Sequence, residues 1–214
     1  MEANSDFSKN ALHKKELEKI LYGNDQMREV FLREYSFFNS DENKSVYIKW
    51  ILEHIEKGKL NSNIVISHIF EIAMNIDYFS QQLLKYANLI LKNRYYEETK
   101  LSCLDYINTQ KDKIKITEFQ RINELAIIST RNEIIKFQSY INLLNTNNSC
   151  LKYIKNILEQ AKYPTLFYRL GYQFSSIPNN IKSELKLFIK AAIETQNFSE
   201  DVKKELRKIY GVQR

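Results

Sequence analysis

The scarcity of turn-forming residues constrains the fold of this chain more than any other feature. Its 214 residues include only four glycines and two prolines. Hairpins, sandwiches and Gly-rich phosphate loops depend on these residues at their tight turns. The sequence therefore disfavours all-β and Rossmann-type folds and predicts helices. The hydrophobic fraction of 43% and the charged fraction of 27% are typical of a soluble globular protein.

Apolar residues recur along the whole chain at the spacing of amphipathic helices. Gly23, Gly58 and Gly211 follow directly after such periodic runs, where a left-handed C-terminal cap favours glycine. Pro164 and Pro178 stand at predicted helix starts, where a missing backbone N–H is tolerated. The predicted helices cover residues 8–22, 25–38, 45–57, 62–75, 77–92, 94–109, 117–129, 131–145, 149–162, 164–175, 178–195 and 199–210.

The segment IISTRNEII, from Ile127 to Ile135, decides how two of these helices are connected. In one continuous helix, Thr130 and Glu133 would project from the middle of an apolar stripe, and burying an unpaired carboxylate there would be unfavourable. A turn at 129–131 removes this conflict and makes Thr130 and Glu133 the capping box of the next helix. We therefore predict a helical hairpin here, in preference to a single kinked helix.

The sequence predicts an all-α fold of about ten to twelve antiparallel helices in hairpin pairs, forming a single all-helical domain over residues 1–214. Further predicted pairs are 62–75 with 77–92 and 178–195 with 199–210. The spacing between pairs is about 30 to 40 residues, as in helical-repeat arrays. No known repeat signature is present, so a short α-solenoid with HEAT-like texture and a compact multi-helix bundle both remain open.

The known signatures of helical enzymes are missing from the sequence. The histidines His13, His54 and His68 are not spaced as a zinc pair, and no Glu-x-x-His di-iron motif occurs. His68 and Glu71 could act as a base and its orienter, but an exposed polar pair is the simpler interpretation. We expect no catalytic residues, no metal site and no cofactor. A cryptic hydrolase using this pair is the least favoured hypothesis.

Cys103 and Cys150 both lie in apolar helical patterns, which indicates buried free thiols rather than a disulfide framework. The first ten residues do not resemble a secretory signal, and no apolar run is long enough to span a membrane. These features favour a cytoplasmic protein that does not bind membranes.

Aromatic residues beside basic ones are the most distinctive surface feature of the sequence. The chain contains 14 tyrosines and carries a net charge of +6. Tyrosine and arginine are enriched at the hot spots of protein interfaces, and they also suit single-stranded nucleic acid. Packing of these rings between helices is the alternative interpretation for each one. The candidate partner-binding residues, drawn from two segments of the chain, are Arg94, Tyr95, Tyr96, Tyr163, Arg169 and Tyr172.

The leading functional hypothesis is therefore a non-enzymatic protein-binding module. Its specific form is an inhibitor, such as an immunity protein that neutralises a toxin by occlusion. The expected partner is another protein with an acidic surface, which the basic and aromatic residues would cover. An RNA- or DNA-binding helical-repeat protein is the alternative, and it would require the basic residues to gather on one face.

Overall fold

The computed structural model describes residues 19–38 and 40–212, with the side chains of 35–38 left aside. Throughout this part the chain forms helices and no strand, which confirms the all-α fold. The predicted helix at 8–22 is present from residue 19 to 22, whereas its earlier part and His13 lie outside the described residues. The helices that follow are α2 (Asp25–Phe38), α3 (Asp41–Glu56), α4 (Asn63–Asn75), α5 (Gln81–Lys92), α6 (Glu97–Thr109), α7 (Ile116–Ser129), α8 (Glu133–Leu143), α9 (Cys150–Glu159), α10 (Thr165–Gln173), α11 (Asn179–Thr195) and α12 (Glu200–Tyr210).

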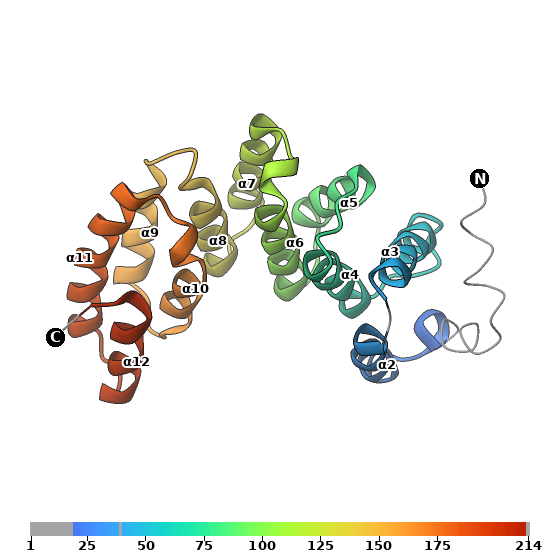
Figure 1. Ribbon diagram of the computed structural model, residues 1–214, viewed down its shortest axis with the longest axis horizontal. Helices are drawn as coiled ribbons and strands as arrows, with labels where there is room; N and C mark the ends of the chain where they lie inside the picture. Colours follow the sequence, from blue (N-terminus) through green and yellow to red (C-terminus); the bar gives the residue numbers. More distant parts are fainter. Residues whose placement is uncertain (1–18, 39, 213–214) are drawn as a thin grey trace. The chain divides into compact units, whose positions relative to one another are not determined.

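The contacts within the chain divide it into two compact units, whose helices are labelled in Figure 1. Unit 1 covers Met1–Ile116 and unit 2 covers Thr117–Arg214. Each unit has its own set of buried apolar side chains, and each is described by itself below. The single domain expected from the sequence stays a prediction.

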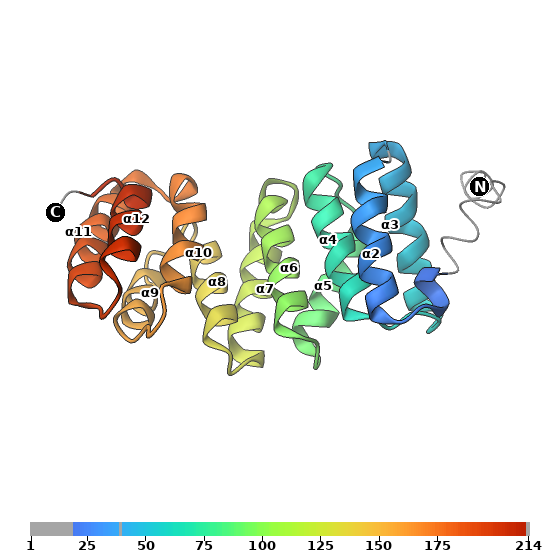
Figure 2. The ribbon, with the colours of Figure 1, turned by 90° about the horizontal axis from the view of Figure 1, so that it is seen from below.

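Unit 1 is organised around α4, which is the most apolar helix of this unit. It packs against α2 and α3 and most extensively against α6, which in turn packs against α5. The rings of Phe70 on α4 and Tyr106 on α6 lie 5.3 Å apart between their centroids, and both side chains are fully buried. Helices α2, α4 and α6 therefore form one layer of successive neighbours, and α2 lies beside α4 in Figure 2.

Unit 2 repeats this order of packing. Helix α8 packs against α9 and α10, α10 packs against α12, and α11 packs against α9 and α12. Helices α8, α10 and α12 thus form one layer and α9 and α11 a second. The α11–α12 contact confirms one predicted hairpin pair. The other predicted pair is corrected, because the main partner of α4 is α6 rather than α5.

The predicted break between residues 129 and 131 is confirmed, but its capping residue is not the predicted one. Helix α7 ends at Ser129, and α8 begins at Glu133. Asn132, rather than Thr130, is the N-cap, and its Oδ1 accepts hydrogen bonds from the backbone N–H groups of Ile134 and Ile135 at 2.8 and 3.1 Å. Thr130 instead accepts a hydrogen bond from the backbone of Asn132 at 3.1 Å. Asn132 thus satisfies free backbone N–H groups in the first turn of α8, the role predicted for Thr130.

Two helices, α5 and α6, start three or more residues later than the sequence predicted. Helix α5 begins at Gln81 instead of 77, because the Ser80 hydroxyl caps it by accepting from the backbone of Leu83 at 3.1 Å. Helix α6 begins at Glu97 instead of 94, since Tyr96 already has the extended backbone of an N-cap. Arg94 and Tyr95 therefore lie in the connection before α6.

The glycines fulfil different structural requirements. Gly58 and Gly211 have φ values of 66° and 60°, so both end their helices in the predicted left-handed conformation. Gly23 is required for a different reason, since a Cβ there would lie 2.2 Å from the carbonyl oxygen of Lys19. Cys103 and Cys150 are free and buried, as expected. No helix within the described residues has the length and apolar character needed to cross a membrane.

Candidate functional site

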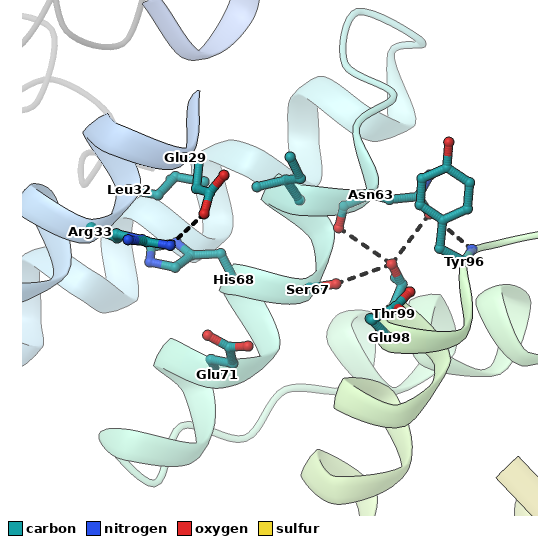
Figure 3. A pocket seen from close by; sticks show the side chains of 11 residues that line it. Glu29, Leu32, Arg33, Asn63, Ser67, His68, Glu71, Tyr96, Glu98 and Thr99 are labelled. Atoms are coloured by element: carbon teal, nitrogen blue, oxygen red, sulfur yellow. Dashed lines mark hydrogen bonds and ion pairs between the residues drawn. The ribbon is translucent and has the colours of Figure 1, made fainter. Parts of the chain in front are cut away.

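The candidate site is a half-open cavity of about 480 Å³ in unit 1, on the layer formed by α2, α4 and α6 (Figure 3). All three helices of the layer contribute walls, and Tyr96 stands at the start of α6. We refer to it as the α2/α4/α6 groove. Its lining residues are Glu29, Leu32, Arg33, Asn63, Ile64, Ser67, His68, Glu71, Tyr96, Glu98 and Thr99.

Helix α4 forms the floor of the groove because of a four-residue polar spacing in its sequence. Asn63, Ser67 and Glu71 recur at i, i+4 and i+8, which places them on one face of a helix. The opposite face carries the buried Val65, Ile69 and other core residues. One helix thus supplies both the core of unit 1 and a polar floor.

A hydrogen-bond cluster joins α4 to the start of α6. Thr99 is buried, and its hydroxyl lies 3.0 Å from the Ser67 hydroxyl and 3.3 Å from Asn63 Oδ1. The same Asn63 oxygen accepts from the backbone N–H of Tyr96 at 3.3 Å. This arrangement fixes the Tyr96 backbone, while its side chain remains 68% exposed at the rim.

The opposite side of the groove carries an ion pair and a half-buried imidazole. Arg33 donates to Glu29 at 2.5 Å, one helical turn away on α2. Burial lowers the pKa of His68 from 6.5 to about 4, against the opposing effect of a hydrogen bond to the Leu32 backbone. His68 is therefore neutral at neutral pH, and its buried Nδ1 has no hydrogen-bond partner among the described residues.

Two further carboxylates of the groove stand outside this ion pair. Glu71, on α4, is on the same side as His68 in Figure 3, and partial desolvation raises its pKa. Glu98 lies in the first turn of α6 and is exposed. Neither forms an ion pair within the described part of the chain.

A second cavity, of about 670 Å³, lies over α9 in unit 2 and is less well built for binding. Apart from Glu184 on α11, its lining comes from α9 and the residues just before it. Lys155 and Glu184 already neutralise each other there at 2.5 Å. The α2/α4/α6 groove is the better candidate because three helices enclose it.

The residues singled out from the sequence fall into both units. Tyr96 lines the groove, whereas Arg94 is exposed and Tyr95 is half-buried just before it. Tyr163 and Tyr172, in unit 2, are 74% and 86% exposed. Arg94, Tyr95 and Tyr96 thus belong to unit 1, and Tyr163, Arg169 and Tyr172 belong to unit 2.

Arg169 has a structural environment of its own in unit 2. Its Nε donates to Gln138 Oε1 at 2.6 Å, Gln138 donates to Asn142 Oδ1 at 2.8 Å, and Asn142 donates to Asn123 Oδ1 at 3.0 Å. Asn123, Gln138 and Asn142 are completely or almost completely buried. Arg169 is half-buried and ends an amide chain that links α7, α8 and α10.

The sequence singled out His68 and Glu71 but missed Asn63, Ser67 and Thr99. The four-residue spacing on α4 was a readable signal, but only the packing of α4 against α6 brings Thr99 to it. No group of three or more His, Cys, Asp or Glu side chains within residues 19–38 and 40–212 could hold a metal ion.

The geometry defines this chain as an all-α protein with a layered helical packing and a polar groove on one layer. Comparison with models of protein families, with curated proteins and with solved structures gave no significant match. Functional inference therefore depends on the groove itself.

Proposed function

We propose that this chain is a non-enzymatic, cytoplasmic protein-binding module that holds a segment of its partner in the α2/α4/α6 groove. The observation that carries the proposal is the construction of the groove from three successive helices of one layer. Stacked helices commonly bind polypeptides along the surface that such a layer presents. The volume of about 480 Å³ is enough for a few side chains.

The lining of the groove supports a polypeptide as the occupant. Leu32 and Ile64 provide apolar wall, while Asn63, Ser67 and Thr99 provide hydrogen-bonding groups. An exposed tyrosine at the rim, Tyr96, is the kind of residue that dominates interface hot spots. The Tyr96 backbone is held by Asn63, so its ring is partly pre-organised for contact.

The specific role proposed is inhibition of the partner by occlusion, as an immunity protein does to a toxin. A rigid floor on α4 would hold a partner segment while the rest of the chain covers neighbouring surface. His68 supports a binding role over a hydrolytic one, because its buried Nδ1 has no hydrogen-bond partner among the described residues and so activates no nucleophile there.

Site-specific photocrosslinking in the native host tests the proposal. A benzoylphenylalanine in place of Tyr96 is expected to form an adduct with one discrete protein, and this adduct survives nuclease treatment. The matched control carries the same group in place of Tyr172, which is even more exposed than Tyr96 but lies in unit 2. An adduct that forms from position 172 but not from position 96 would contradict the proposal and indicate that the partner binds to unit 2.

Nucleic acid is the alternative partner, because the chain carries a net charge of +6. In that case the adduct would disappear after nuclease treatment, and binding would weaken steeply with added salt. Either result would replace the protein-binding proposal.

A further inference from the structure

We infer that the α2/α4/α6 groove recognises a lysine or arginine side chain of the partner polypeptide, with the cation placed among the carboxylates of Glu71, Glu98 and Glu29. This inference deepens the proposed function and depends on it for the source of the side chain. The sequence led us to expect a partner with an acidic surface. For this groove we instead expect a partner segment that carries a basic side chain.

The first argument is charge. The groove is lined by three carboxylates and one guanidinium, which leaves an excess of two negative charges. The whole chain has the opposite sign, at +6. Since Arg33, the only positive group among the described lining residues, is already paired with Glu29, the remaining carboxylates are available to a cation. The negative electrostatic potential in the groove therefore favours a positively charged ligand there, although the chain as a whole is positively charged.

The second argument is the electrostatic state of the groove wall. His68 is neutral at neutral pH because burial lowers its pKa, so it does not cancel the carboxylates. Glu71 is exposed and has no ionic partner among the described residues, and desolvation by the surrounding wall raises its pKa. A bound ammonium or guanidinium would supply the missing partner and return that pKa toward lower values.

The third argument is hydrogen bonding. The carboxylates of Glu29, Glu71 and Glu98 line the groove, and ionised carboxylates only accept hydrogen bonds. The buried Nδ1 of His68 adds a ring nitrogen without a hydrogen-bond partner among the described residues. The groove thus has an excess of acceptors, whereas lysine and arginine side chains carry only donors.

The fourth argument is the shape of the lining. Long cationic side chains lay their methylene groups on apolar surface while the charged end stays at polar groups. Leu32 and Ile64 provide such a surface, and the Tyr96 ring at the rim can also stack against a guanidinium. A short polar residue would leave this apolar wall uncovered.

The test uses two capped amino acids, Nα-acetyl-arginine methylamide and Nα-acetyl-lysine methylamide, titrated into the full chain. The His68 imidazole signal, followed by NMR, reports on the groove, and His68→Gln assigns it. His54 is the internal control, since it is not one of the residues that line the groove. Its Nδ1 lies 2.8 Å from the Trp50 carbonyl oxygen, to which it is hydrogen-bonded. We expect saturable shifts of the His68 signal only. The uncharged analogue Nα-acetyl-citrulline methylamide is expected to have little effect.

Matched charge variants separate the groove from general electrostatics. The double change Glu71→Gln with Glu98→Gln should weaken binding of the arginine compound by about fivefold, the effect of losing two partly exposed ion pairs. The control, Glu124→Gln with Glu159→Gln, removes the same charge from exposed positions in unit 2 and should leave affinity unchanged. Equal weakening in both variants, equal binding of the citrulline compound, or no His68 shift would overturn the inference.

The outcomes distinguish this inference from the proposed function. A protein adduct at Tyr96 whose crosslinked segment lacks lysine and arginine would overturn the inference and leave the proposed function standing. Binding of the capped amino acids without any protein adduct at Tyr96 would overturn the proposed function and leave the groove as a binding site for a cationic side chain. Tighter binding of spermidine than of either capped amino acid would overturn the assignment to a polypeptide side chain.

Discussion

At the scale of single residues, the half-buried imidazole of His68 links stability to pH. Its pKa is about 4 in the folded chain and about 6.5 when exposed. The unfolded chain therefore binds more protons between these values, and the free energy of unfolding falls as pH decreases through this range. The charged groups that line the groove together with His68 are Glu29 and Arg33 on α2, Glu71 on α4 and Glu98 on α6.

We predict that lowering the pH from about 7 to about 5 destabilises the wild-type chain by about 2 kcal/mol more than the His68→Gln variant. Glutamine keeps an N–H donor for the Leu32 carbonyl and cannot titrate. The raised pKa of Glu71 acts with the opposite sign, because its stabilising effect is lost as pH rises. It is present in both chains and so cancels. Urea unfolding at both pH values measures the difference, and equal losses would contradict the prediction.

Asn142 has a different importance, because it connects two other buried amides in unit 2. Its side chain donates to Asn123 and accepts from Gln138, and all three are shielded from water. Asn142→Ala should lower the free energy of unfolding by about 2 to 4 kcal/mol, since it leaves two buried polar groups without these partners. Asn156→Ala, at an exposed position on α9, is the control and should change it by less than about 0.5 kcal/mol. Denaturant unfolding compares them, and similar losses would remove the special role of Asn142.

At the scale of helices, Gly171 determines how closely α10 approaches α12. A Cβ at this position would lie 2.5 Å from Ile209 Cγ2, and the Tyr210 hydroxyl donates nearby to the Phe167 carbonyl. Alanine favours a helix more than glycine, so this change would stabilise α10 if the space allowed it. The branched Ile209 side chain has few rotamers available for moving aside.

We predict that Gly171→Ala destabilises unit 2 by about 1 kcal/mol or more through overpacking. In an Ile209→Ala background the same change should become neutral or stabilising, because the contacting methyl group is gone. A double-mutant cycle of thermal or denaturant unfolding measures the coupling. The same effect in both backgrounds would show that the Ile209 contact does not determine the packing.

Sequence patterns predicted the helices better than the contacts between them. The periodicity located α2 to α12, and the buried-carboxylate argument located the break between α7 and α8. The N-cap of α8 was misassigned because both Thr130 and Asn132 can accept hydrogen bonds at a helix start. Each choice obeys the same local rule.

The candidate groove was only half visible in the sequence for a physical reason. His68 and Glu71 share a helix, so their proximity follows from the helical repeat. Thr99 meets Asn63 and Ser67 through packing of α4 on α6, which no local spacing encodes. Arg169 was singled out as a surface residue because the three amides that lead to it lie on α7 and α8, far from it in the sequence.

At the scale of the whole molecule, the division into two units raises the question of how each is stabilised. The apolar core of unit 2 contains buried residues from α8 to α12, including Phe137, Leu158 and Leu185. Each of these is completely shielded from solvent. The amide chain of Asn123, Gln138 and Asn142 also lies within unit 2. A unit with its own core and its own polar network has the interactions that a separate domain requires.

We predict that a fragment of residues 117–214 folds alone and unfolds in one cooperative transition, because its core residues contact one another within the fragment. Circular dichroism and thermal unfolding of the fragment measure this, with Leu185→Ala as a variant that should lower the midpoint markedly by opening a cavity in the core. Cooperative unfolding that is sensitive to this change would make unit 2 a domain in its own right. An unstructured fragment would instead mean that the chain folds as the single domain expected from its sequence.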